Sequence, residues 1–136
     1  MAQHYIGTKQ ITAWPEEKDK QSGYAVRYPD GYTSWSPRDT FEAAYFPMGE
    51  LEDGSKITEK MVDGFIQSYE SQTIGEKNTV VRAVLLNGFE IIESSSCVDP
   101  KNYDEELGTE ICLKRIKDKT WLLLGFTLQW ATTGIQ

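Results

Sequence analysis

The dipeptide Asn87-Gly88, set between two apolar runs, is the feature that most constrains how this chain can fold. Residues 79–86 and 89–96 on either side are rich in the residue types that strands favour. Asn-Gly suits a two-residue turn between antiparallel strands, because both turn positions need positive φ. The sequence therefore predicts a β-hairpin that turns at this dipeptide.

A two-residue turn also predicts the register of the hairpin. It places Val84 opposite Ile91 and Arg82 opposite Glu93, all on one face of the sheet. The second pair brings opposite charges together, which favours this register.

Two helices are expected beside the hairpin. Residues 57–73 form the first, because Ile57, Met61, Phe65 and Tyr69 recur every four residues as an apolar stripe. The second is long and begins near Asn102, which can serve as its N-terminal cap with Glu105 three residues on.

The long C-terminal helix is predicted to run to Leu128 or beyond. The large apolar side chains expected along one of its sides are Leu107, Ile111, Leu122 and Phe126. From Trp121 onward the helix is apolar almost all round, so it needs burial on several sides. In a chain of 136 residues this indicates burial against a second subunit.

The N-terminal part predicts short strands. Residues 5–14 contain alternating β-formers, and residues 23–37 divide into two strands around the turn Pro29-Asp30-Gly31. We therefore expect an N-terminal β-rich module over residues 1–50 and a second region over residues 51–136. The predicted fold class is α+β, an antiparallel sheet with two helices, of which the C-terminal one is long and used in oligomerisation.

Composition excludes several function classes. The formal net charge of −7 opposes general binding of DNA or RNA. No apolar stretch is long enough to span a membrane, and the N-terminus has no apolar run typical of a signal peptide. Two cysteines and one histidine leave no metal-site spacing, so neither a metal nor a cofactor is expected, and the cysteines are expected to be reduced thiols.

Catalysis has little support in the residues. The sequence has no motif of a nucleophile elbow, a zinc protease, a phosphate loop or a dinucleotide fold. A catalytic Cys97 would need a histidine partner, and His4 lies near the chain end. We therefore expect a protein that is not an enzyme and has no catalytic residues.

A site for a small anion is better supported by the residues. The stretch Ser94–Cys97 leads into a helix N-terminus, although it also fits a hydrogen-bonded strand end. Phe89 can stack on a base or pack in the core with Leu86. The guanidinium of Arg115 matches phosphate oxygens, and a surface pair with a nearby acid is the alternative.

A resemblance adds to this interpretation. The segments VVRAVLLNGFEIIESSSCVDPKNYDEELGTEI and RIKDKTWLLLGF, within residues 79–128, resemble a family of small proteins of tailed bacteriophages. Within that family they are similar to the Thoeris anti-defence protein 1 group. The segments IGTKQITAWP, GYAVRYPDGYTSWSP and FEAAY, within residues 5–47, resemble a module that precedes several unrelated small phage domains.

The resemblance to the anti-defence group implies a function. Such proteins bind cyclic ADP-ribose isomers, and some also bind cyclic oligonucleotides, without cleaving them. They act in the host bacterial cytoplasm as dimers or hexamers. The resemblance implies base stacking at Phe89, phosphate contacts from Arg115, and polar contacts from Asn87 and Asn102, beside the Ser96 and Cys97 stretch.

Three hypotheses follow for the function. The leading one is a phage protein that binds and sequesters a cyclic ADP-ribose isomer and so blocks Thoeris-type immunity. The alternative is a non-catalytic phage structural or host-interaction protein, in which the hairpin and helix serve dimerisation. The third is a hydrolase of the same signal.

Overall fold

A computed structural model of the protein describes all 136 residues and divides them into two compact units. One unit contains residues 57–125, and the other contains residues 1–56 together with 126–136. The predicted α+β class is confirmed, because the chain has two antiparallel three-stranded sheets and three α-helices, the last of them long. None of these helices combines the length and apolar character that crossing a membrane requires.

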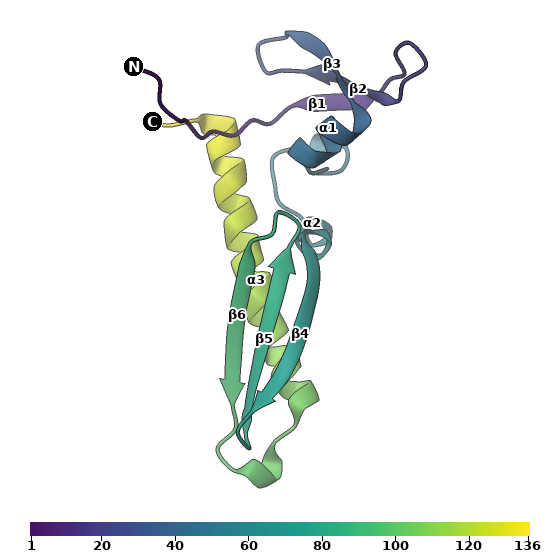
Figure 1. The fold of residues 1–136 in the computed structure, drawn as a ribbon. Helices are drawn as coiled ribbons and strands as arrows, with labels where there is room; N and C mark the ends of the chain where they lie inside the picture. Colours follow the sequence, from purple (N-terminus) through teal and green to yellow (C-terminus); the bar gives the residue numbers. More distant parts are fainter. The chain divides into compact units, whose positions relative to one another are not determined.

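The unit of residues 57–125 is a three-stranded sheet with the long helix against one face (Figure 1). Its strands lie in the order β4-β5-β6. The elements in chain order are α2 (Glu59–Phe65), β4 (Ile66–Ile74), β5 (Asn78–Leu85), β6 (Glu90–Ser96), a short 3-10 helix (Pro100–Asn102) and α3 (Glu105–Thr133).

The core of this unit lies between the sheet and α3. Side chains along β5 alternate between buried and half-buried positions, as expected for a central strand with one covered face. The buried apolar residues that pack together are Val81, Ala83, Leu85, Ile91, Cys112 and Ile116. The two cysteines, Cys97 and Cys112, are free thiols.

The unit of residues 1–56 and 126–136 contains the second sheet, in the order β1-β2-β3. Its elements are β1 (Thr12–Pro15), β2 (Gly23–Arg27), β3 (Thr33–Pro37), α1 (Arg38–Ala44), a short 3-10 helix (Leu51–Asp53) and the end of α3. The predicted turn at residues 29–31 joins β2 and β3, with Gly31 at φ +90°. The predicted first strand over residues 5–14 is shorter, because pairing with β2 begins only at Thr12.

The predicted helix over residues 57–73 is wrong beyond Phe65. The chain becomes extended at Ile66 and forms β4, which pairs along its length with β5. Tyr69, which completed the predicted helical stripe, lies opposite Ala83 and is 53% exposed. Backbone pairing with an apolar central strand outweighs a weak helical periodicity, since local propensity differs little between the two states.

The hairpin between β5 and β6 is confirmed, but its predicted register is wrong by one residue. The Leu85 N–H donates to the carbonyl of Phe89, and the Gly88 N–H donates to the carbonyl of Leu85. The hairpin loop therefore consists of the three residues 86–88. Gly88 alone in that loop has positive φ, at +87°, as in a turn followed by a left-handed glycine. Consequently Val84 lies opposite Glu90, and Arg82 lies opposite Ile92 rather than Glu93.

The long helix is confirmed, but its predicted cap is wrong. Asp104 caps it: Oδ1 accepts from the backbone N–H of Glu106 at 3.0 Å and of Leu107 at 3.3 Å. Asn102 instead ends the preceding 3-10 helix. The buried positions are Gly108, Cys112, Ile116, Thr120 and Leu124. The predicted apolar side is exposed, at Leu107, Ile111, Leu122 and Phe126.

Candidate functional site

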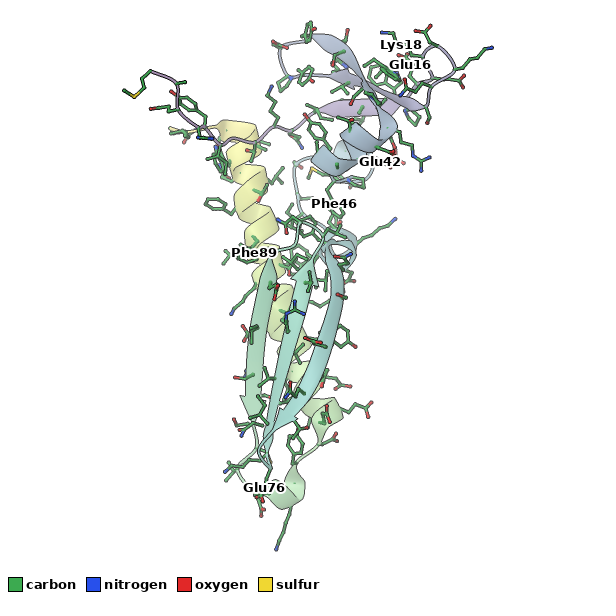
Figure 2. The ribbon with its side chains drawn as sticks, viewed as in Figure 1. Glu16, Lys18, Glu42, Phe46, Glu76 and Phe89 are labelled. Carbon is green, nitrogen blue, oxygen red and sulfur yellow. The ribbon has the colours of Figure 1, made fainter.

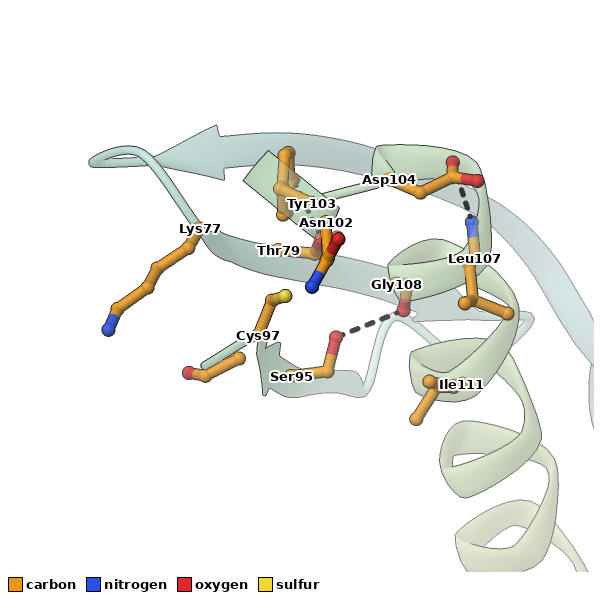
Figure 3. A pocket seen from close by; sticks show the side chains of 11 residues that line it. Lys77, Thr79, Ser95, Cys97, Asn102, Tyr103, Asp104, Leu107, Gly108 and Ile111 are labelled. Atoms are coloured by element: carbon orange, nitrogen blue, oxygen red, sulfur yellow. Dashed lines mark hydrogen bonds between the residues drawn. The ribbon is translucent and has the colours of Figure 1, made fainter. Parts of the chain in front are cut away.

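A pocket of about 210 Å³ lies where β6 ends and α3 begins (Figure 3). It also reaches the start of β5 and the turn before it. Its walls are formed by Lys77, Thr79, Ser95, Ser96, Cys97, Asn102, Tyr103, Asp104, Leu107, Gly108 and Ile111. The lining is therefore mostly polar and small on the strand side, and apolar on the helix side.

A network of hydroxyl groups forms the floor of this pocket. The Tyr103 hydroxyl hydrogen bonds with Thr79 Oγ1 and with Thr73 Oγ1, both at 2.8 Å. It also donates to the carbonyl of Asn78 at 3.4 Å. Because these partners lie on β4 and β5, Tyr103 anchors the segment before α3 to the sheet.

The first turns of α3 lie very close to the sheet beside the pocket. A Cβ added to Gly108 would overlap the Thr79 hydroxyl, so only glycine permits this approach. Ser95 Oγ donates to the carbonyl of Gly108 at 3.3 Å, which joins β6 to the same turn (Figure 3).

Two charged side chains line the pocket, Lys77 and Asp104. Lys77 Nζ donates to the carbonyl of Val98 at 3.1 Å and retains two further N–H donors. The Asp104 carboxylate faces the first backbone N–H groups of α3. Lys77 therefore supplies the pocket's positive charge, while the helix N–H groups offset the charge of Asp104.

Three predicted site residues meet in this pocket: Ser96, Cys97 and Asn102. Ser96 Oγ donates to Asn78 Oδ1 at 2.6 Å, and Cys97 Sγ donates to the carbonyl of Asp99 at 3.1 Å. The Asn102 side chain points between Cys97 and the pocket floor (Figure 3).

The other predicted residues lie elsewhere in the same unit. Phe89 and Asn87 are at the opposite end of β6, about 20 Å from Ser96 for a strand of this length. Figure 2 shows Phe89 at the end of the sheet remote from Glu76, which lies in the turn beside the pocket. The Phe89 ring is 55% exposed, and its backbone N–H donates to Asn87 Oδ1 at 3.1 Å.

Arg115 lies on α3 beside the free edge of β6. Its Nη1 donates to the carbonyl of Ser94 at 2.6 Å, a backbone contact rather than the surface ion pair considered as an alternative. The side chain is not part of the pocket lining. In a single chain the predicted site residues therefore lie in three places. Ser96, Cys97 and Asn102 lie at the pocket, Asn87 and Phe89 at the hairpin turn, and Arg115 between α3 and β6.

Sequence reasoning missed Lys77 and Tyr103 as site residues. Lys77 lies in the turn between β4 and β5. The sequence does not reveal this turn as long as residues 66–73 are predicted to be helical. Its signal was Gly75, which has φ +69° and starts that turn. Tyr103 comes directly before the capping Asp104, but an aromatic residue at that position carries no distinct signal.

Comparison with known proteins gives one family. The model of the "Phage protein (N4 Gp49/phage Sf6 gene 66) family" matches residues 57–132, which is more than half of the chain. No curated protein and no solved structure matches the chain. The match includes the pocket, the hairpin and most of α3, and begins after the N-terminal sheet.

Proposed function

Because the chain belongs to the N4 Gp49/phage Sf6 gene 66 family of phage proteins, we propose that it binds and sequesters a cyclic ADP-ribose isomer without cleaving it. In this proposal the protein acts in the host bacterial cytoplasm and blocks Thoeris-type immunity by withholding the signal. Cyclic oligonucleotides are a second candidate class of ligand. The resemblance of residues 79–128 to the Thoeris anti-defence protein 1 group supports this choice of ligand.

The observation that carries the proposal is the pocket between β6 and α3. It places a lysine ammonium, an asparagine amide and several hydroxyl groups around one small cavity. These are donors that suit phosphate and ribose oxygens, and Lys77 strengthens a contact with phosphate because it is charged. Three of the residues expected to contact the ligand, Ser96, Cys97 and Asn102, lie there.

The size of the pocket favours a site completed by a second copy of the chain. Ligand pockets usually enclose about 300–1,000 Å³, whereas this one encloses about 210 Å³. One chain would therefore hold one part of a cyclic ADP-ribose isomer. The exposed ring of Phe89, about 20 Å away along β6, then serves a pocket of the neighbouring subunit.

The outer side of α3 supports such an assembly. Leu122 of α3 is 71% exposed and lies outside the pocket lining, and Leu107 and Ile111, which line the pocket, remain 54% and 39% exposed. Burying these side chains between two copies removes apolar surface from water. We therefore propose a homo-oligomer, dimer or hexamer, that uses α3.

Binding without cleavage is supported by the state of the reactive groups in the pocket. The Cys97 thiol donates to a backbone carbonyl, and the Asp104 carboxylate accepts from the start of α3. Neither group is paired with a side chain that would activate it as a nucleophile or base.

The test is retention of the ligand by the full chain. The protein is mixed with a cyclic ADP-ribose isomer and filtered, and the retained fraction is heated and analysed. Release of intact ligand supports the proposal, and release of a cleaved product indicates a hydrolase. Lys77→Met should lower retention, whereas the matched variant Lys114→Met, at an exposed lysine outside the pocket, should not.

A second candidate function follows from the exposed side of α3 alone. In it, the chain is a phage structural or host-interaction protein whose hairpin and helix form a dimerisation surface. Failure to retain any nucleotide, together with a Leu122→Glu variant that changes from oligomer to monomer, favours this candidate. Retention that disappears with the oligomer favours a ligand site shared between subunits.

A further inference from the structure

Two tryptophans flank the central strand on one face of the N-terminal sheet. Trp14 of β1 and Trp35 of β3 both lie directly opposite Ala25 of β2. Residues that are directly paired across antiparallel strands point to the same face, so the two indoles share a face with this small residue. Ala25 between them is only 6% exposed.

Helix α1 covers the other face of this sheet. Tyr24, which precedes Ala25 and so points the opposite way, stacks on Phe41 of α1 with ring centroids 4.2 Å apart. Its hydroxyl donates to Glu42 at 2.7 Å. The tryptophan face is thus distinct from the face that forms the interior of this unit.

The Trp35 ring is held in a fixed position. It packs against Gly23, where a Cβ would overlap both the ring and the carbonyl of Ser36. Its Nε1–H donates to the carbonyl of Glu16 at 2.8 Å. Figure 2 places Glu16 and Lys18 together in the loop between β1 and β2. A ring oriented by backbone contacts loses little freedom when a ligand packs on it.

Each indole also has a cation over its ring, on an exposed side chain that a ligand can displace toward its own carboxylates. The Lys18 Nζ is 5.7 Å from the centroid of the Trp35 ring, and the Arg27 guanidinium is 5.3 Å from that of Trp14. Trp14 nevertheless remains 40% exposed. The face therefore combines two aromatic surfaces with positive charge at each, in a chain of net charge −7.

The backbone positions of the two tryptophans are separated by about one repeat of a polyproline II helix. They lie two strands apart, which corresponds to about 9.5 Å at the usual strand spacing. A polyproline II helix has three residues per turn and rises 3.1 Å per residue, so prolines at positions i and i+3 are about 9.3 Å apart. Aromatic-lined surfaces recognise such segments because the helix is already ordered before binding.

We propose that the Trp14–Ala25–Trp35 face binds a proline-rich peptide in the polyproline II conformation, with acidic residues flanking the prolines. Prolines at i and i+3 pack on the two indoles, and Arg27 and Lys18 pair with the flanking carboxylates. This face belongs to the N-terminal sheet and uses no residue of the pocket between β6 and α3. Single-stranded nucleic acid, which also stacks on aromatic rings, is less favoured because of the net negative charge.

The test is an NMR titration of the ¹⁵N-labelled full chain. The probe is an octaproline flanked by glutamates, and the control peptide has the same ends with glycine and serine in place of proline. The chain has four tryptophans, so Trp121 and Trp130 provide internal controls. The indole signals of Trp14 and Trp35 should shift with the probe alone, and Trp14→Ala should weaken binding at least tenfold, whereas Tyr32→Ala, at an exposed ring outside this face, should not.

A charge reversal keeps the test decisive if Trp14→Ala fails to fold. Arg27→Glu changes an exposed side chain, and it should weaken the glutamate-flanked probe and favour a lysine-flanked one. The proposal is overturned if the probe shifts neither indole signal at concentrations up to about 1 mM. It is also overturned if the control peptide binds equally well, or if octathymidylate shifts the same indoles at lower concentration than the probe.

Discussion

Gly108 of α3 lies against Thr79 of β5, so closely that a Cβ at position 108 would overlap the Thr79 hydroxyl. Both residues line the pocket, and Thr79 is fully buried. Gly108→Ala should therefore destabilise the protein by about 1–3 kcal/mol, the usual range for overpacking a core. Urea unfolding followed by circular dichroism measures this loss.

A second glycine of the same helix provides the control. A Cβ at Gly125 meets no atom within 4 Å. Gly125→Ala should therefore stabilise the protein, by up to about 1 kcal/mol, because alanine favours the helical backbone. Equal effects of the two substitutions would contradict the close approach of α3 to β5.

Arg82 joins the two outer strands on the exposed face of the sheet. Its Nε donates to Glu90 at 2.5 Å and its Nη1 to Glu70 at 3.2 Å. The hydrogen bond from Arg82 lowers the pKa of the Glu90 carboxyl below its usual value. The stabilisation linked to this shift is present above the unfolded-state pKa, about 4.3. It is lost as the pH falls through the folded-state pKa.

The stability difference between the wild type and Arg82→Gln should therefore be constant near neutral pH and shrink below about pH 4. Urea midpoints measured between about pH 7 and pH 3 test this expectation. Lys114→Gln, at an exposed lysine on α3, should show no such pH-dependent difference. A difference that stays constant across the whole range would mean that Arg82 acts only through packing.

The sequence predicts the hairpin between β5 and β6 well, and its register poorly. Asn-Gly identifies the turn, but two- and three-residue loops can use the same dipeptide. The choice depends on which face of β5 is buried, and that is decided by α3, far along the chain. Since a slip of one residue exchanges the two faces, Arg82 was assigned the wrong partner.

Long-range packing also explains the errors in the helices. The apolar stripe from Ile57 to Tyr69 suits a helix locally. Residues 66–74 nevertheless form a strand, because they pair with the edge of β5 that β6 leaves open. On α3, the large apolar residues Leu107 and Ile111 mark one side of the helix in the sequence, but they do not identify the side that packs on the sheet. The close approach at Gly108 instead turns Cys112 and Ile116 inward. The predicted site therefore includes the residues at the start of the helix but not the pocket walls formed by the turn before β5 and by β5.

The turn between β1 and β2 contains two non-glycine residues in the left-handed region. Asp19 has φ +50° and Lys20 has φ +66°, and Lys18 and Gln21 close the turn with two backbone hydrogen bonds of 2.9 Å. This conformation favours glycine at the second position. Lys20→Gly should raise the stability of the N-terminal unit by about 0.5–1 kcal/mol. Thermal unfolding of the full chain gives the shift, and Lys20→Ala should not reproduce it, because alanine has the same strain.

Arg115 provides the test that is most specific to the proposed ligand. Its Nη1–H···O bond to the Ser94 carbonyl orients the guanidinium and leaves other N–H donors for a phosphate. One charged hydrogen-bonding contact is worth about 1.5–3 kcal/mol, so Arg115→Ala should weaken retention of a cyclic ADP-ribose isomer at least tenfold. Equilibrium filtration measures the affinity, with the neighbouring Lys114→Ala as the matched control.

Arg115→Lys should bind the ligand almost as weakly as Arg115→Ala, because a lysine ammonium lacks the planar group that contacts the Ser94 carbonyl and a phosphate at the same time. Unchanged retention by a folded Arg115→Ala protein would remove Arg115 from the site and leave the pocket lysine, Lys77, as the cation that must account for binding.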